Sequence, residues 1–389
     1  RFPLPEDHEF LEQLLEHEKE ARVQEGMERI AALLDQGMPP KRSRALCGKL
    51  RYLQDTAGNE DLRAQVKQAH WTVRGPSFIG LHELFDAGCD HWVADGGDGT
   101  LHWMLSVGFQ VARERSGGKV PERLPRVVPA NGGSIDFVAY KAGIRGQATD
   151  VLRQLVAAFE RGEVLPTVEL DTFRMRGHGE GARAGSGGEP ELDRLGFASA
   201  IGGVAQRFFE KLYERRPVDS RAIVTVLANS LAGAVVSTTP RPLRSFVPGS
   251  LQRLEDWADS LFEPTRARVE LDGQPLGYDE FASLQIGSID INLGGVVRTF
   301  RHAASPGVLH AQAICMPPWE LAANLPNLVL GTPIWGRKVY DGPARHLRAV
   351  AHPGGVLDPV IDGELFFGLR ELEVEAGPRL EVPVVCAAG

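Results

Sequence analysis

A glycine-rich segment, Gly-Gly-Asp-Gly-Thr at residues 96–100, narrows the possible folds more than any other part of the sequence. The apolar run at residues 91–93 precedes it, and residues 101–105 follow with apolar side chains at helical spacing. This order predicts a strand, a tight loop and a helix. Glycines let the backbone approach a polyphosphate closely, and the first turn of a helix presents N–H groups to an anion. The segment therefore predicts a phosphate-binding loop.

Asp98 lies in the middle of this segment. A carboxylate repels phosphate, so Asp98 must act either through a cation or by accepting a proton from an attacking hydroxyl group. Both roles belong to phosphoryl transfer. The structural alternative is a solvated Gly-Asp turn between a strand and a helix.

Residues 96–100 resemble the signature of diacylglycerol kinases, sphingosine and ceramide kinases, NAD kinases and, more distantly, phosphofructokinases. A second motif, Gly-Ser-Ile-Asp at residues 133–136, is similar to the Gly-Ser-Thr-Asp of ceramide kinases, with Asn131 and Gly132 inserted ahead of it. Near the C-terminus, residues 362–364 match the Asp-Gly-Glu of the same superfamily. The three motifs stand in the family's order, and the closest resemblance is to ceramide kinase-like bacterial lipid kinases.

The resemblance implies ATP as phosphoryl donor, Mg²⁺ as cofactor and a lipid as acceptor. Asp98 and Glu364 are the implied catalytic residues, Asp98 also being the contact to Mg²⁺, and Asp136 is the implied substrate contact. For Ser134 and Asp136 the alternative is a helix N-cap. The implied nucleotide contacts are Gly96, Gly97, Asp98, Gly99, Thr100, Gly132, Gly133 and Ser134.

The chain departs from the family at three places. Trp103 stands where lipid kinases commonly carry Glu, and Ile135 replaces an Asn of many lipid kinases. The N-terminal part of the sequence contains no Asn-Pro-x-x-Gly loop, which in the family touches the nucleotide. These departures keep a relative without catalysis open as an alternative.

The bulk properties fit an acidic protein with a substantial core. The chain has 389 residues, 43% of them hydrophobic, and a net charge of −8, which argues against nucleic-acid binding. Four scattered cysteines favour neither a disulfide framework nor a zinc site. No apolar stretch approaches the roughly 18 residues of a membrane span. The sequence therefore predicts a cytoplasmic protein whose membrane contact is peripheral.

Periodicity predicts an α/β domain followed by a β-rich domain. Strands alternate with helices over residues 67–165, which predicts a Rossmann-like nucleotide-binding domain ending in a helix at residues 147–161. From residue 166 to 389 the pattern changes to period two and predicts a β-rich, sandwich-like lipid-substrate domain. Residues 1–66 have helical spacing and predict a helical extension. The strands expected in the β-rich region are at residues 168–173, 195–198, 266–272, 281–287, 308–315, 346–351, 358–362 and 371–376.

A basic and apolar concentration at residues 240–262 is the candidate for membrane contact. Three arginines alternate there with apolar residues, so the segment can lie at a lipid interface. A core-packed helical excursion is the alternative. The residues predicted to meet the membrane are Arg241, Arg244, Phe246 and Arg253.

The preferred function is a kinase that transfers the γ-phosphoryl group of ATP to the primary hydroxyl of ceramide or diacylglycerol. A kinase for a soluble acceptor such as NAD is one alternative, although residues 133–137 lack the Asn-Glu pair of NAD kinases. A lipid- or nucleotide-binding protein without catalysis is the other.

Overall fold

The computed structural model describes residues 81, 84–121, 124–133, 136–179, 192–213, 225–226, 228–230, 232–233, 257, 260–293 and 297–384. Contacts within the chain group Arg1–Gly88 into one compact unit and Cys89–Gly389 into another. The helical extension predicted for residues 1–66 and the candidate membrane segment with Arg241, Arg244, Phe246 and Arg253 lie outside the described residues. The predicted domain boundaries stay predictions.

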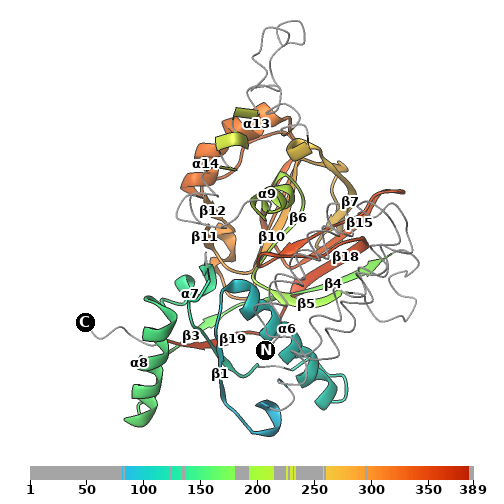
Figure 1. Ribbon diagram of the computed structural model, residues 1–389. Helices are drawn as coiled ribbons and strands as arrows, with labels where there is room; N and C mark the ends of the chain where they lie inside the picture. The colour runs from blue at the N-terminus through green and yellow to red at the C-terminus, as the bar shows by residue number, and fades with distance from the viewer. Residues whose placement is uncertain are drawn as a thin grey trace, which may run out of the picture. The chain divides into compact units, whose positions relative to one another are not determined.

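The second unit begins with a strand, a helix and a parallel strand (Figure 1). β1 (His91–Ala94) pairs with β2 (Arg126–Pro129), and α6 (Asp98–Arg115) connects the two. A parallel pair needs such a crossover, because the chain must return to the same end of the sheet. The strand, loop and helix predicted around residues 91–105 are therefore confirmed.

Two helices follow β2. α7 (Phe137–Lys141) is short, and α8 (Ala148–Glu160) is the helix predicted at residues 147–161. α8 buries Val151, Leu155 and Ala158 on one face. The helix ends at Glu160, and Gly162 after it has a left-handed φ of +67°, as is common just past a helix C-cap.

Most of the remaining strands form two antiparallel sheets, so the mixed α/β class is confirmed. In strands such as β4, buried and partly exposed side chains alternate, which gives each sheet a core face. The first sheet has the order β14 (Val339–Ala344), β13 (Leu309–Ile314), β10 (Ser283–Gly287), β6 (Ala198–Gly203), β16 (Val360–Ile361) and β17 (Glu364–Leu365). The second has the order β5 (Leu192–Gly196), β4 (Phe173–Gly179), β18 (Leu369–Ala376), β15 (His346–Ala351), β7 (Thr265–Leu271) and β8 (Gln274–Pro275), with β9 (Glu280–Phe281) on β7.

The prediction of one strand at residues 168–173 is wrong, because the chain turns at Asp171 and Thr172. β3 (Thr167–Leu170) ends before the turn and pairs with β19 (Leu380–Pro383), whereas β4 belongs to a sheet. The Thr172 hydroxyl donates to the carbonyl of Pro378 at 2.6 Å and so holds the turn beside β19. β19 also lies beside β2. The strand predicted at residues 358–362 is likewise shorter, since Asp362 begins a turn after β16.

Smaller elements complete the described part of the chain. α9 (Val204–Tyr213) follows β6 and packs on β6 and β10. Within the described residues, no helix combines the length and the apolar character that crossing a membrane requires. The remaining elements are β11 (Ile291–Leu293), β12 (Val297–Thr299), the 3₁₀ helix η1 (Arg301–Ala304), α13 (Pro318–Ala323) and α14 (Leu325–Leu330).

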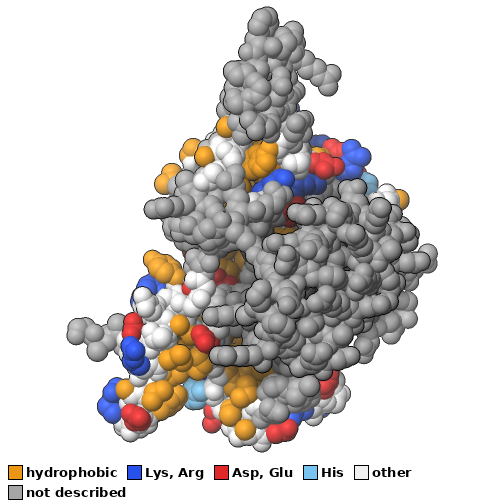
Figure 2. All heavy atoms as spheres, viewed as in Figure 1, with side chains coloured by type: hydrophobic (Ala, Val, Ile, Leu, Met, Phe, Trp, Pro, Cys, Tyr) orange, Lys and Arg blue, Asp and Glu red, His pale blue; other side chains and the backbone are white. Residues whose placement is uncertain are grey.

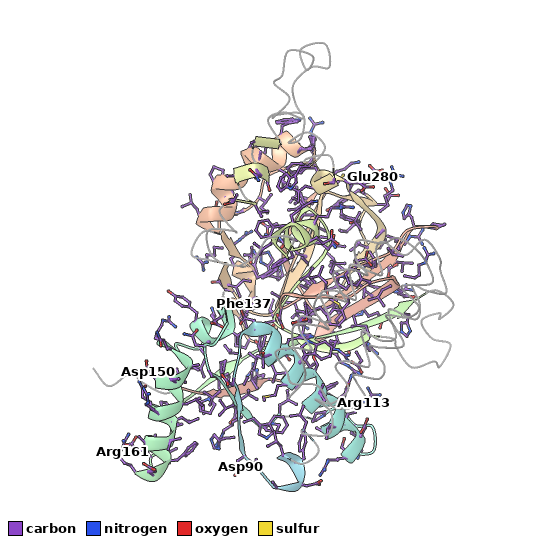
Figure 3. The ribbon with its side chains drawn as sticks, in the orientation of Figure 1. Asp90, Arg113, Phe137, Asp150, Arg161 and Glu280 are labelled. Atoms are coloured by element: carbon purple, nitrogen blue, oxygen red, sulfur yellow. The ribbon has the colours of Figure 1, made fainter. Side chains whose placement is uncertain are left out.

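Polar contacts fix α6 against β5. The hydroxyl of Ser106 donates to the carbonyl of Leu195 at 3.2 Å and accepts from its N–H at 3.1 Å. Near the C-terminal end of α6, Arg113 and Arg174 both donate to the buried carboxylate of Asp193 at 2.8 Å. Figure 3 shows Arg113 and Phe137 near opposite ends of α6. These contacts hold the middle and the C-terminal end of α6 against the sheet.

A buried carboxylate on β14 organises the edge of the first sheet. Asp341 accepts hydrogen bonds from His310 at 2.8 Å, from Gln312 at 2.9 Å and from the N–H of Ile334 at 2.9 Å. It also pairs with Arg301 at 2.7 Å. Burial alone would raise the pKa of Asp341, but these hydrogen bonds hold that pKa well below its usual range.

We expect Asp341→Asn to lower the free energy of unfolding by about 2–3 kcal/mol at neutral pH, because it removes a charge that several buried donors share. The depressed pKa means that this stabilisation is present above the unfolded-state pKa and disappears as the pH falls through the folded-state value. Urea denaturation at pH 7 measures the loss. As a control, Asp150→Asn removes the exposed pair with Arg153 and should cost less than about 0.5 kcal/mol.

Candidate active site

Two glycine-rich loops run side by side beyond the ends of β1 and β2. The N–H of Ala130 donates to the carbonyl of Ala94 at 3.0 Å, and the N–H of Gly132 donates to that of Gly96 at 3.2 Å. Parallel pairing thus continues past the ends of the strands. It brings together the two segments predicted to bind the nucleotide, which begin at Gly96 and at Gly132. Ser134 and Ile135 lie outside the described residues.

The backbones of the two loops touch at Gly97 and Gly133. A Cβ atom on Gly97 would lie 2.8 Å from the Cα atom of Gly133. A Cβ atom on Gly133 would overlap the Cα atom of Gly97 and lie 2.5 Å from Oδ1 of Asp136. Glycine is therefore required at both positions by the packing of one loop on the other.

Asp98 is the first residue of α6, and its carboxylate also caps α7. Oδ2 accepts from the N–H of Phe137 at 3.0 Å, and Oδ1 accepts from the N–H of Val138 at 3.1 Å. These are the first two residues of α7. The side chain thereby ties the start of α6 to the start of the next helix.

Burial raises the pKa of Asp98 to about 7. The two backbone donors of α7 lower this pKa, and the nearby charges of Asp362 and Asp136 raise it further. A carboxyl group with this pKa can both lose and hold a proton near neutral pH. Asp98 is thus suited to accept a proton or to meet a cation.

Asp136 faces back toward the second loop. It adopts a left-handed backbone with φ of +51°, and both of its carboxylate oxygens accept from the N–H of Gly133, at 3.0 and 2.8 Å. Burial raises the pKa of Asp136, and the bond from Gly133 lowers it. Asp136 occupies the N-cap position of α7, as the alternative predicted, but its side chain makes no capping hydrogen bond there. Asp98 provides the cap instead.

The Asp-Gly-Glu motif forms the turn between β16 and β17. Asp362 and Gly363 have φ values of +48° and +84°, as in a two-residue hairpin turn. The Asp362 carboxylate accepts from the N–H groups of Phe197 at 3.0 Å and Ala198 at 2.8 Å, which fixes the turn on the segment between β5 and β6. The carboxylate of Glu364 lies where a Cβ atom on Gly99 would be. Glu364 therefore reaches the first turn of α6.

His102 lies one helical turn after Asp98 on α6 and is fully buried. Its Nδ1 atom is 3.5 Å from Oδ2 of Asp362, and its ring contacts those of Trp103 and Phe366. Sequence reasoning missed His102, although its spacing of four residues from Asp98 places both on one face of the helix.

Trp103, one of the departures from the family, packs beside this group. The guanidinium of Arg194 lies 4.9 Å from the centre of the Trp103 ring, and the ring of Phe366 lies 6.2 Å from it. Trp103 therefore belongs to an aromatic cluster between α6 and the segment after β17. In this structure Trp103 has a packing role.

Three carboxylates thus lie around the start of α6, those of Asp98, Asp362 and Glu364, with Asp136 on the second loop. The described residues contain no group of three or more His, Cys, Asp or Glu side chains arranged to hold a metal ion. A Mg²⁺ ion typically takes only one or two protein carboxylates and completes its coordination with phosphate oxygens and water. Asp98 fits that arrangement, because the neighbouring negative charges that raise its pKa also favour a cation.

Comparisons with known proteins give low similarity. No family model matches the chain. The DNA protection during starvation protein of Agrobacterium fabrum is 29% identical over 108 residues, 27% of this chain and 54% of that protein, so the chain spans about half the length of this curated relative.

Solved structures give similarity in shape at low sequence identity. The crystal structure of a diacylglycerol kinase from Bacillus anthracis has a TM-score of 0.44 and 11% identity, over 79% of this chain and 81% of that chain. Yeast NADH kinase, solved in complex with NADH, has a TM-score of 0.39 and 10% identity, over 76% and 61% of the two chains. These values establish no family.

Proposed function

We propose that this protein is a kinase that transfers the γ-phosphoryl group of ATP to a hydroxyl group of a membrane lipid, ceramide or diacylglycerol. The observation that carries the proposal is the position of Asp98, with its pKa of about 7, between two touching glycine loops and the Asp362–Glu364 turn. The lipid acceptor is supported by the likeness of residues 133–136 to the motif of ceramide kinases.

The site can bind a phosphate chain through backbone groups. α6 has 18 residues, and its N-cap is Gly97, so no side chain caps its first turn. The N–H groups of that turn and the positive end of the helix dipole suit phosphate oxygens. Thr100 lies in the same turn and adds a hydroxyl group. When bound, Mg²⁺ would neutralise charge on the transferring phosphoryl group.

In the proposed reaction Asp98 takes the proton of the acceptor. The hydroxyl oxygen forms a bond to the γ-phosphorus, while the bond from that phosphorus to the β–γ bridging oxygen breaks and ADP leaves with its electrons. The hydroxyl proton passes to the Asp98 carboxylate, whose raised pKa makes it a better acceptor than an ordinary Asp. Glu364, at the first turn of α6, would orient the hydroxyl group or the cation.

One observation favours the alternative of a binding protein without catalysis. Both carboxylate oxygens of Asp98 already accept backbone hydrogen bonds from α7, which by itself is a structural role. Carboxylate oxygens have lone pairs beyond these two bonds, so capping and proton transfer are compatible. Activity measurements decide between them.

The test is transfer of label from ATP carrying ³²P at the γ-position to ceramide, sphingosine, diacylglycerol and NAD in parallel. We expect label in the lipid products, ceramide or diacylglycerol foremost. Label in NAD alone would indicate a soluble-substrate kinase. Absence of label from every acceptor, with ATP binding intact, would establish the binding protein instead.

Glu364→Gln is expected to lower kcat by about tenfold or more with little change in the KM for ATP, because an acid acting on the acceptor matters mainly in the transition state. Steady-state kinetics on the preferred acceptor measure both constants. Glu280→Gln is the control, since this exposed carboxylate on β9 forms a surface ion pair with Arg266. A loss confined to ATP affinity would move Glu364 to the nucleotide site.

A further inference from the structure

α13 carries a firmly packed inner side. Leu321 of α13 is buried together with Ile314, Met316 and Ile334, and Val204, Phe262 and Val339 pack against this cluster. The inner side of α13 and of the loop with Ile334 is therefore part of the protein core. Other side chains of α13, α14 and this loop face solvent.

The outer side presents large apolar groups to solvent. Trp319 is 54% exposed, Leu330 is 67% exposed and Trp335 is 51% exposed. Figure 2 shows hydrophobic side chains on the surface where Figure 1 places α13 and α14. Exposing two tryptophans to water is unfavourable, so a concentration of this kind points to a binding surface.

The loop with Trp335 is held rigidly on the helices. The side-chain amide of the buried Asn324 donates to the carbonyl of Trp335 and accepts from its N–H, both at 3.0 Å. Asn327 donates to Asn324 at 3.0 Å and accepts from the Thr332 hydroxyl at 3.0 Å. A Cβ atom on Gly336 would lie 3.3 Å from the carboxylate of Glu320, so the residues after Trp335 and Trp319 are neighbours. The exposed groups therefore form one fixed surface.

The segment that carries these exposed groups, residues 317–338, has a net charge of +1, opposite in sign to that of the chain. Exposed Arg337 and Lys338 follow Trp335 after Gly336, and Glu320 is the one acidic residue within residues 317–338. The whole chain carries a net charge of −8. Tryptophan rings favour the boundary between headgroups and acyl chains, and adjacent cations are attracted to anionic lipid.

We propose that Trp319, Leu330, Trp335, Arg337 and Lys338, the tryptophan platform, bind the headgroup region of an anionic lipid bilayer. The apolar side chains enter the headgroup boundary, and Arg337 and Lys338 meet anionic headgroups. The platform would bring a kinase to a lipid acceptor and in this sense rests on the proposed function. Binding to vesicles needs neither ATP nor turnover, so it is measured independently of that function.

A second group of exposed apolar side chains offers a matched control. Val156 and Phe159 on α8 are 54% and 45% exposed, and Val164 follows the helix. The same segment, residues 148–164, contains three acidic residues and two basic ones, Arg153 and Arg161. The same apolar character thus occurs there without a positive balance of charge.

The experiment is sedimentation of the full chain with vesicles of phosphatidylcholine and phosphatidylglycerol in a 70:30 ratio. We expect the wild type to bind, and Arg337→Glu with Lys338→Glu to lower the partition coefficient by about tenfold or more. The control pair Arg153→Glu with Arg161→Glu makes the same change in net charge and should bind as the wild type does. The proposal would be overturned if the two double variants lost vesicle binding equally. It would also be overturned if the double variant of Arg337 and Lys338 bound as well as the wild type, or if the wild type did not bind.

A second readout locates the contact. The chain has six tryptophans, and quenching of their fluorescence by brominated acyl chains should fall strongly in Trp319→Phe with Trp335→Phe. Unchanged quenching would place the contact elsewhere and contradict the proposal. A shift from dimer to monomer in this variant, with vesicle binding retained, would identify a second copy of the chain as the occupant.

Phosphorylation of a short-chain, water-soluble acceptor should be unchanged in all platform variants. Failure of the kinase assignment is therefore distinguishable from failure of the membrane proposal.

Discussion

Asp98→Asn is expected to lower the rate of phosphoryl transfer by about a hundredfold or more, the scale of losing a general base or a charge-stabilising contact. Asparagine has nearly the same shape, and its amide oxygen can still accept one of the two bonds from α7. The variant should therefore fold, which circular dichroism checks. Activity within threefold of the wild type would remove Asp98 from the chemistry and leave it as a helix cap.

The raised pKa of Asp98 also predicts how stability depends on pH. Because its folded-state pKa of about 7 exceeds the ordinary 3.8, the folded protein holds a proton that the unfolded chain releases between these values. The contribution of Asp98 to stability is thus full below the unfolded-state pKa and is lost as the pH rises through about 7. Asp98→Asn has no such dependence.

The difference between the variant and the wild type isolates this effect. We expect the free energy of unfolding of Asp98→Asn minus that of the wild type to rise between pH 5 and pH 8, in buffer with a chelator and without nucleotide. A pH-independent difference would contradict the raised pKa. In activity assays, kcat/KM of the wild type should rise with pH toward about 7 as the carboxyl group loses its proton.

Gly133→Ala is expected to lower kcat/KM by about a hundredfold, because the added methyl group meets the backbone of the first loop and the carboxylate of Asp136. Backbone cannot rotate away as a side chain would, so the loops must separate. Misplacing phosphate-binding groups by about 1 Å costs on this order in rate. The variant should also lose about 1–3 kcal/mol of stability through overpacking.

Gly277→Ala is the matched control for this substitution. Gly277 is exposed, and a Cβ atom there would have no neighbour within 4 Å. It should retain the activity and the melting temperature of the wild type. If Gly133→Ala keeps wild-type activity as well, the contact between the two loops does not shape the site.

Local patterns predicted several elements closely. The amphipathic spacing of residues 147–161, with a glycine after it, predicted α8. The strand expected at residues 346–351 has the same bounds as β15. The glycines at residues 96–100 predicted the turn from strand to helix. The Asp-Gly pair at residues 362 and 363 forms the tight hairpin that such a pair favours. In each case the determining interactions lie within a few residues.

Contacts between distant residues were not predictable in this way. Nothing near Asp98 in the sequence shows that its carboxylate caps α7, about forty residues later. The burial of His102 depends on Asp362 and Phe366, and the end of β3 depends on Pro378. The exposure of Trp319 and Trp335 is equally a tertiary property, since apolar residues at such spacing are commonly core residues.

The most direct test of the central claim is transfer of ³²P from the γ-position of ATP into lipid by the wild type and by Asp98→Asn side by side. Lipid vesicles carrying ceramide or diacylglycerol are incubated with each protein and Mg²⁺, and the organic phase is extracted and counted. We expect labelled lipid with the wild type and at most about one hundredth of that rate with Asp98→Asn. Equal labelling by both proteins, or none by the wild type, would contradict the assignment of Asp98 to lipid phosphorylation.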